Sequence, residues 1–451
     1  MKHARARFTE GSIAGHIIAT ASASAVSLLA VFLVDILTLV YVSMLHDQTA
    51  LAAVGLAKTL AFISGAFCSG VVIAGGAVLS QRIGRHGSRA SARLSSHLLI
   101  MVLGVASVVA AIELAGVAYM GQWLGSDAAA YAVALQFVWI VLPCGVLVAA
   151  AQMCAQMLRA QGHVRLAMAV LLAGALTLAV ADPLCIFVFG LGLQGAALSY
   201  GLSALVSLLL GLVLVKRHLG LAASVRLKWF RLHVAATLPV ALPAMLGNLA
   251  MPVGITYLMV TLTAMGASAL AGMAVIDRFL QFGYCAFFAL PGALVPVLAQ
   301  NLGAGQLARA RAAIVVIRRV VVLYGLLLWL LLVVFGPYAA DHFELQGSGR
   351  DMFMAFCRFG AGAWILYGLD FVAQSIFLTI ERAWWVPAFG WLRGTLGSIP
   401  FVYAGAHAGG GTGALIGLWT GNALVALLAI FTASRQAQRF FGTPLPARAV
   451  I

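Results

Sequence analysis

Long stretches without a charged residue dominate this chain and restrict what it can fold into. The segments 234–265 and 279–299 contain no Asp, Glu, Lys or Arg, and each is longer than 20 residues. A helix needs about 20 apolar residues to cross a bilayer, whereas barrel strands alternate over about 10 residues. Hydrophobic residues make up 63% of the chain and charged residues only 9%, which excludes soluble and disordered proteins. We therefore predict an all-α integral membrane protein.

Charged residues and glycine-rich breaks divide the chain into twelve expected transmembrane helices. Their bounds are 13–45, 49–80, 94–117, 130–158, 165–190, 193–215, 234–263, 268–300, 312–336, 352–380, 384–407 and 412–434. The first exceeds the about 7–15 apolar residues of a signal-peptide core, so we interpret it as a retained span.

The basic residues predict the orientation of these spans. With a cytoplasmic N-terminus, 22 of the 27 Lys and Arg residues fall at cytoplasmic span ends. They are Arg382 and those within 2–7, 82–93, 159–165, 216–231, 309–319 and 435–448. The outer loops hold Arg350 and the acids Asp47, Asp127, Asp341, Glu344 and Asp351. This positive-inside pattern and the even number of spans place both termini in the cytoplasm. The membrane that we expect is a bacterial inner membrane. The net charge of +15 then reflects topology, and no nucleic-acid partner is expected.

The sequence repeats at an offset of 219 residues. Residues 49–52 match 268–271, and residues 204–206 match 423–425. Gln81 likewise matches Gln300. Six spans per repeat is an even number, so both halves have the same topology and a pseudo-two-fold axis along the membrane normal. We predict two six-helix lobes around a central cavity. The expected parts are an N-terminal lobe 1–215, a cytoplasmic linker 216–233, a C-terminal lobe 234–434 and a cytoplasmic tail 435–451.

Neither a cofactor nor a metal ion is expected. The six cysteines lie within apolar runs and form no CxxC pair, so neither a disulfide framework nor a metal site is indicated. The chain also lacks a phosphate-binding GxxxxGK[ST] loop. An ion gradient is therefore the expected energy source.

Four short motifs resemble those of the multidrug and toxic compound extrusion (MATE) family across residues 12–434. Asp35 precedes LAAVG at 51–55, and LRAQG lies at 158–162. DPLCIF at 182–187 precedes GAA at 195–197, and QNLGAG lies at 300–305. The Asp-Pro pair is similar to that of the DinF-like branch, although Leu178 stands where that branch usually has Asn.

The resemblance implies a monomeric secondary antiporter in a lipid bilayer that works by alternating access. Its substrates would be small organic, cationic or amphipathic compounds, exported in exchange for H⁺ or Na⁺. The choice of ion stays open, because the acid that another branch carries in the seventh span is missing here, where Gly247 and Asn248 stand instead.

Asp35 and Asp182 are the candidate cation-coupling residues. A charge within a span costs about 2.5–3.5 kcal/mol on insertion scales, so it faces a cavity or a partner. Asp35 is expected roughly 15 Å, and Asp182 roughly 12 Å, from the outer end of its helix. The alternative is that these acids are structural and bind nearby hydroxyl groups. Glu113 lies close to an outer span end and is interpreted as interfacial.

Lys58 and Asp277 occupy equivalent positions in the two repeats. Equivalent positions near a pseudo-two-fold axis can face each other, so these residues are a candidate gate across the outer mouth. Alternatively, Lys58 pairs with Asp35 or Asp182 in its own lobe, and Asp277 pairs with Arg278.

Two helix faces combine a carboxylate, an amide and an aromatic ring, which together can bind an organic cation. Their members are the candidate substrate-binding residues: Asp277, Gln281 and Tyr284 in 268–300, and Tyr367, Asp370 and Gln374 in 352–380. The alternative for the aromatic residues is plain helix packing.

Two other function classes remain open. A flippase for lipid-linked precursors would need cavity cations for a pyrophosphate, for which Lys58, Arg278, Arg358 and Arg393 are available. An intramembrane enzyme is the remote alternative, because the chain has neither an HExxH nor a GxSxG motif.

Overall fold

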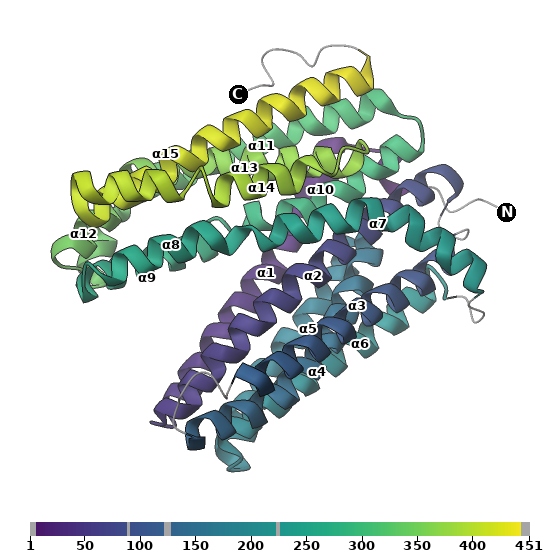
Figure 1. Cartoon of the computed structure of the whole chain (residues 1–451). Coiled ribbons are helices and arrows are strands. Elements are labelled where there is room, and N and C mark those ends of the chain that lie inside the picture. The colour runs from purple at the N-terminus through teal and green to yellow at the C-terminus, as the bar shows by residue number, and fades with distance from the viewer. Residues whose placement is uncertain (1–5, 88–90, 121–127, 222–225, 443–451) are drawn as a thin grey trace. The chain divides into compact units, whose positions relative to one another are not determined.

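The computed structural model is built of helices throughout the part of the chain that it describes (Figure 1). The described residues are 6–87, 91–120, 128–221 and 226–442. Five residues used in the topology prediction lie outside these ranges: Lys2, Arg5, Arg89, Asp127 and Arg448. Within the described ranges, eleven helices are long and apolar enough to cross a membrane, judged by length and composition. The predicted all-α membrane class is therefore confirmed.

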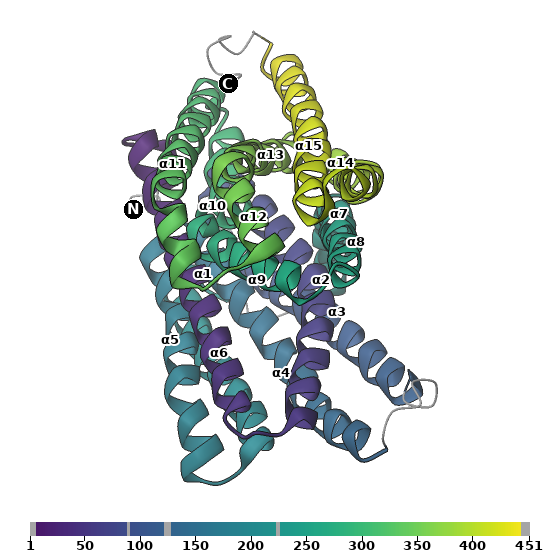
Figure 2. The ribbon, with the colours of Figure 1, turned by 90° about the vertical axis from the view of Figure 1, so that its left-hand side faces the viewer.

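The chain divides into two compact units, and the first comprises Met1–Thr9 and Val26–Met245. Its elements are η1 (Arg7–Thr9), most of α1 (Ile13–Ser43), α2 (Gln48–His86), α3 (Ala92–Met120), α4 (Ala128–Ala160), α5 (Val164–Pro183), the π-helical η3 (Leu184–Val188), α6 (Gly192–His218) and most of α7 (Leu227–Leu249). The central helix is α4, which packs against α2, α3, α5 and α6. Figure 2 shows α4 beside α5 and α6.

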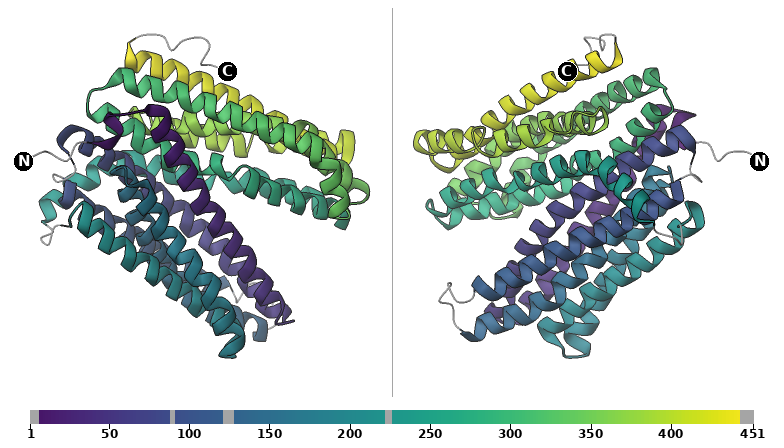
Figure 3. Two further views of the ribbon diagram at one scale, coloured as in Figure 1. Left: turned by 180° about the vertical axis from the view of Figure 1, so that it is seen from behind. Right: turned by 45° about the vertical axis from the view of Figure 1, so that its right-hand side comes forward.

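The second unit comprises Glu10–Ala25 and Leu246–Ile451. Its elements are α8 (Met251–Thr263), α9 (Ala267–Gly283), α10 (Cys285–Gly303), α11 (Leu307–His342), α12 (Gly347–Ala355), the π-helical η4 (Phe356–Gly360), α13 (Ala361–Thr379), α14 (Trp385–Gly394) and α15 (Ile399–Phe441). The central helix is α13, which packs against α10, α11, α14 and α15. Figure 3 shows the green and yellow helices of this unit from two further sides.

Helix boundaries follow the 219-residue repeat seen in the sequence. Helix α4 spans Ala128–Ala160, and the same length shifted by 219 residues is Gly347–Thr379, which holds α12, η4 and α13. The shift also takes Gly192, where α6 begins, to Gly411, directly after a backbone break in α15. The two halves of the sequence therefore form corresponding helices.

Helix α15 is continuous in sequence but doubles back on itself. At residues 409–410 its backbone leaves the helical region. A Cβ atom added to Gly413 would overlap the carbonyl oxygen of Gly405, and one added to Gly417 would overlap that of Phe401. Both pairs are centred on the break, so the two arms of α15 run antiparallel with their backbones in contact. This hairpin explains why eleven long helices are distinguished where twelve were predicted.

Replacing Gly417 by Ala should destabilise this hairpin. The added methyl group would meet the backbone of Phe401, which cannot move aside as a flexible side chain would. We expect a loss of about 3 kcal/mol, the upper end of typical overpacking costs. Thermal unfolding in detergent measures it, with Gly104→Ala as the control, because a Cβ at Gly104 meets open space. Equal melting temperatures for the two variants would contradict the close backbone contact.

Candidate functional site

Asp182 is fully buried in the first unit, at the end of α5. The Thr38 hydroxyl of α1 donates a hydrogen bond to its Oδ2 atom. Its Oδ1 atom has no hydrogen bond of regular geometry within the described residues, and Ser199 of α6 adds a weaker polar interaction. The next residue, Pro183, lacks an N–H group, and the chain widens there into the π-helical η3. The carboxyl group thus lies beside an irregular turn of the kind that is frequent at functional sites.

Asp35 is exposed on the surface of the first unit and lies within electrostatic range of Asp182. Lys58 of α2, also exposed, donates a hydrogen bond from Nζ to the main-chain oxygen of Asp35 at 3.2 Å. The Lys58 ammonium group is also close enough to the Asp35 carboxylate to interact with it electrostatically. The structure therefore brings together the two predicted coupling residues and Lys58. The proposed gate between Lys58 and Asp277 stays a prediction.

Glu113 is, after Asp182, a second buried acid of the first unit, and the residue is only 8% exposed. Its Oε2 atom accepts a hydrogen bond of 2.5 Å from the Ser64 hydroxyl of α2. Its Oε1 atom is enclosed, without a hydrogen-bond partner in the part of the chain that the structure describes. The side chain thus lies between α2 and α3, and its interfacial place at an outer span end stays a prediction.

Asp370 of α13 forms the main ion pair of the second unit. Its Oδ2 atom lies 2.5 Å from Nη1 of Arg393 on α14, and the two side chains are 2% and 16% exposed. The predicted partner Gln374 donates to the same oxygen at 2.8 Å. The acid and amide are therefore together as predicted, but Arg393 compensates the carboxylate charge.

Tyr367 joins this cluster one helical turn before Asp370. The Arg393 guanidinium lies 5.7 Å from the centre of its ring, and Trp364 stacks on the ring at 4.7 Å. The Tyr367 hydroxyl interacts with Asn422 of α15. An aromatic surface and a balanced charge pair thus lie side by side on α13 and α14.

The second predicted face divides where α9 ends. Asp277 and Gln281 lie on α9, and the neighbouring Arg278 donates to the Gln281 side chain at 3.0 Å. Tyr284 lies between α9 and α10, fully buried, and its hydroxyl donates to the main-chain oxygen of Ala361 at 2.8 Å. Tyr284 is fully buried, whereas Asp277 and Gln281 are partly exposed. Its role in substrate binding stays a prediction.

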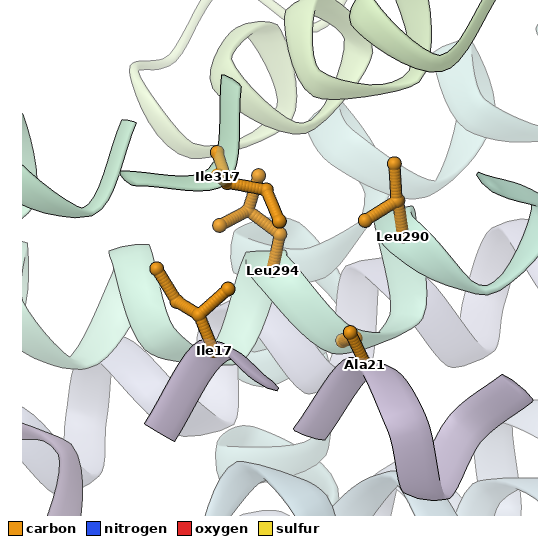
Figure 4. Close-up of a pocket in the computed structure, with 6 residues that line it drawn as sticks. Ile17, Ala21, Leu290, Leu294 and Ile317 are labelled. Atoms are coloured by element: carbon orange, nitrogen blue, oxygen red, sulfur yellow. The ribbon is translucent and has the colours of Figure 1, made fainter. Parts of the chain in front are cut away.

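A pocket in the second unit is lined only by apolar side chains (Figure 4). They come from α1, α10 and α11: Ile17, Ala21, Leu290, Ala293, Leu294 and Ile317. Such a lining offers no charge or hydrogen bond to a ligand. The ionisable clusters described above are therefore the better candidates for the functional site.

His163 lies just before α5, and its surroundings make it unsuitable as a proton carrier. Burial, helped by the charges of Arg7 and His218, lowers its pKa to about 4. Its ring packs on that of His218 at 4.4 Å. The imidazole is therefore neutral at pH 7 and does not titrate near that pH.

Sequence reasoning considered Arg393 only as a cavity cation of a flippase, not as a partner of Asp370, and it assigned neither Asn422 nor Ser64 to a site. A usable signal existed for Arg393, since a buried acid such as Asp370 needs a partner and the spans contain few cations. The periodicity of a helix shows which residues share a face, but not which helix lies opposite. Asn422 and Ser64 therefore had no recognisable signature.

Comparisons with known proteins agree with this fold. The curated relatives include an uncharacterised 21 kDa protein from Pseudomonas savastanoi, 38% identical over 53% of this chain and 78% of the relative. They also include an FAD transporter from Shewanella oneidensis, 26% identical over 62% of this chain and 63% of the relative.

Solved structures match over nearly the whole chain at 20% identity. A mutant of the Vibrio cholerae MATE transporter VcmN has a TM-score of 0.89 and covers 96% of this chain and 99% of its own. A MOP superfamily transporter from Pyrococcus furiosus has a TM-score of 0.86 and covers 98% and 99%.

The sequence pattern of the MatE family matches this chain twice, at residues 23–184 and 243–388. The two matches begin close to one repeat length apart, which agrees with the internal repeat. Together they cover more than half of the chain, so the protein belongs to the MatE family of membrane transporters and is not an enzyme.

Proposed function

We propose that this transporter is a secondary antiporter that exports small organic compounds in exchange for H⁺, with Na⁺ as the alternative ion. The observation that carries the proposal is the fully buried Asp182, hydrogen-bonded to Thr38 and within electrostatic range of Asp35. An ionised carboxylate is costly in such a place, whereas a protonated one is tolerated. Binding or release of a proton at Asp182 therefore changes the free energy of the conformation in which this side chain is buried.

The irregular backbone beside Asp182 is the proposed conformational element. A proton bound to Asp182 would shift the equilibrium between its conformations. The carboxyl group binds Thr38 of α1 on one side, and η3 follows it directly on the other. A proton shifts the balance between two conformations only if it binds one of them better. In the proposed cycle, protonation favours the enclosed arrangement of Asp182, and proton release favours one in which the carboxylate meets water.

The second unit supplies the proposed substrate contacts. The charge of Asp370 is compensated by Arg393, so the pair can form polar contacts without a net charge. Trp364 and Tyr367 add two stacked aromatic rings. On α9, Asp277 and Gln281 lie next to Arg278. Mixed charges beside aromatic rings suit amphipathic compounds as well as cations.

The remaining parts of the proposal concern architecture and location. The break in α15 separates two arms, which we count as two spans, giving twelve in two six-helix lobes around a central cavity. We place the lobes at 1–215 and 234–434, the linker at 216–233 and the tail at 435–451. The protein would be a monomer of the bacterial inner membrane with cytoplasmic termini, nearer the DinF-like branch.

A flippase or a carrier of anionic compounds is the second candidate function. Arg278 and Arg358 are exposed in the second unit and are available to a phosphate group. The FAD transporter among the relatives handles a phosphate-containing compound. This alternative would need these arginines, whereas the preferred function would need the acids of the first unit.

Transport by purified protein in liposomes separates the two candidates. A fluorescent cationic dye is loaded, and a pH gradient or a Na⁺ gradient is imposed separately. We expect dye export with the pH gradient. Transport of a fluorescent lipid pyrophosphate or of FAD, together with no dye export under either gradient, would favour the second candidate.

A further inference from the structure

Glu113 has the properties of a binding group rather than of a surface acid. The residue is only 8% exposed. Its Oε2 atom accepts a hydrogen bond from the Ser64 hydroxyl group at 2.5 Å, and its Oε1 atom has no hydrogen-bond partner among the described residues. Within the same residues, no basic side chain forms an ion pair with it. An enclosed carboxylate without a cation is costly, so the neutral acid is the form that this conformation accommodates.

The surroundings of Glu113 suit a proton and not a metal ion. Hard cations are held by several oxygen ligands at once. Here the Ser64 hydroxyl group approaches the carboxyl group, and the buried thiol of Cys68 on α2 lies within electrostatic range of it. Helices α2 and α3 are regular around Ser64 and Glu113, so their main-chain oxygens are engaged within the helices. A proton needs only the free oxygen of the carboxyl group.

Ser64 connects this enclosed acid to the surface of the first unit. Its side chain is partly exposed, and its neighbours Ile63 and Gly65 on α2 are exposed. The same helix carries Lys58, which contacts Asp35. A displacement of α2 would therefore alter both the contact with Asp35 and the contact with Glu113.

We propose that Glu113 and Ser64 form a second proton-binding site, separate from Asp35 and Asp182, that carries a proton in each transport cycle. The proposal rests on the proposed antiport function and adds to it the number of protons exchanged.

The test compares Glu113→Gln with wild-type protein in liposomes under a pH gradient of one unit, with the membrane potential clamped at zero. One coupled proton fewer lowers the limiting substrate gradient about tenfold. Glu113→Gln should therefore reach a gradient about one tenth that of wild type, while Glu344→Gln, at an exposed acid, matches wild type. Equal limiting gradients for Glu113→Gln and wild type would overturn the proposal.

If wild-type protein forms no substrate gradient, the antiport function itself is contradicted. A second measurement then still tests the proton-binding site. Infrared difference spectra between acidic and alkaline pH detect protonated carboxyl groups in purified protein. A carbonyl band that is lost in Glu113→Gln and moves in Ser64→Ala supports the site. An unchanged set of bands in Glu113→Gln would overturn it. Ser64→Ala keeps the carboxyl group, so it also serves if Glu113→Gln fails to fold.

Discussion

Export driven by a pH gradient should fall to background when Asp182 is replaced by Asn. The amide has nearly the shape of the carboxyl group and can still accept the hydrogen bond from Thr38, so folding should survive. It cannot bind and release a proton near pH 7. Asp35→Asn should have the same effect if both acids act as one coupled site. Dye export from liposomes under an imposed pH gradient measures the loss.

The matched control is Asp341→Asn. Asp341 forms an exposed ion pair with Arg350 at 2.6 Å, with side chains 64% and 42% exposed, and such pairs contribute about 0–1 kcal/mol. This variant should transport like wild type. Gradient-driven export by Asp182→Asn at the wild-type rate would show that Asp182 is only structural, which is the alternative that the sequence left open.

Replacing Arg393 by Ala should destabilise the second unit by about 3–5 kcal/mol, because it leaves the Asp370 carboxylate buried without its partner. The double variant Asp370→Asn/Arg393→Gln removes both charges and should recover most of that loss. Thermal unfolding of the purified protein measures both effects. Arg278→Ala is the control, because Arg278 is exposed and contacts the neighbouring Gln281.

Additive losses in the double variant would contradict this account of Asp370. They would indicate that each side chain contributes through separate contacts, such as those of Arg393 with the Tyr367 ring. A double variant that is stable but does not transport would indicate that the pair acts in substrate binding.

Much of the fold could be predicted because it depends on local properties of the chain. Long uncharged runs indicated the membrane helices, and the 219-residue offset indicated the correspondence that α4 and the segment Gly347–Thr379 display. The break at residues 409–410 was also predicted, as the gap between two spans. What the sequence did not indicate is that glycines let the two arms of α15 touch backbone to backbone.

The candidate site was predicted less completely, because its contacts join different helices. Helical periodicity placed Asp370 and Gln374 on one face, and they do interact. It could not show that Arg393, on another helix, lies opposite them. Nor could it show that Ser64 of α2 contacts Glu113 of α3, because these residues lie on different helices.

The two repeats share their helices but not their charges. At the 219-residue offset, Asp182 corresponds to Phe401 and Asp370 corresponds to Ala151. The first unit thus holds acids without an ion pair in the described residues, and the second holds the compensated pair of Asp370 and Arg393. This asymmetry supports a division in which one unit couples the ion and the other contacts the substrate.

Proton movement measured together with substrate movement tests the central claim most directly. Purified protein is placed in liposomes that contain a pH-sensitive dye, and a substrate gradient is imposed without a pH gradient. The account predicts that substrate flux drives protons in the opposite direction, and that Asp182→Asn stops the substrate flux and the proton flux together. Substrate flux in wild-type protein without any proton movement would contradict it.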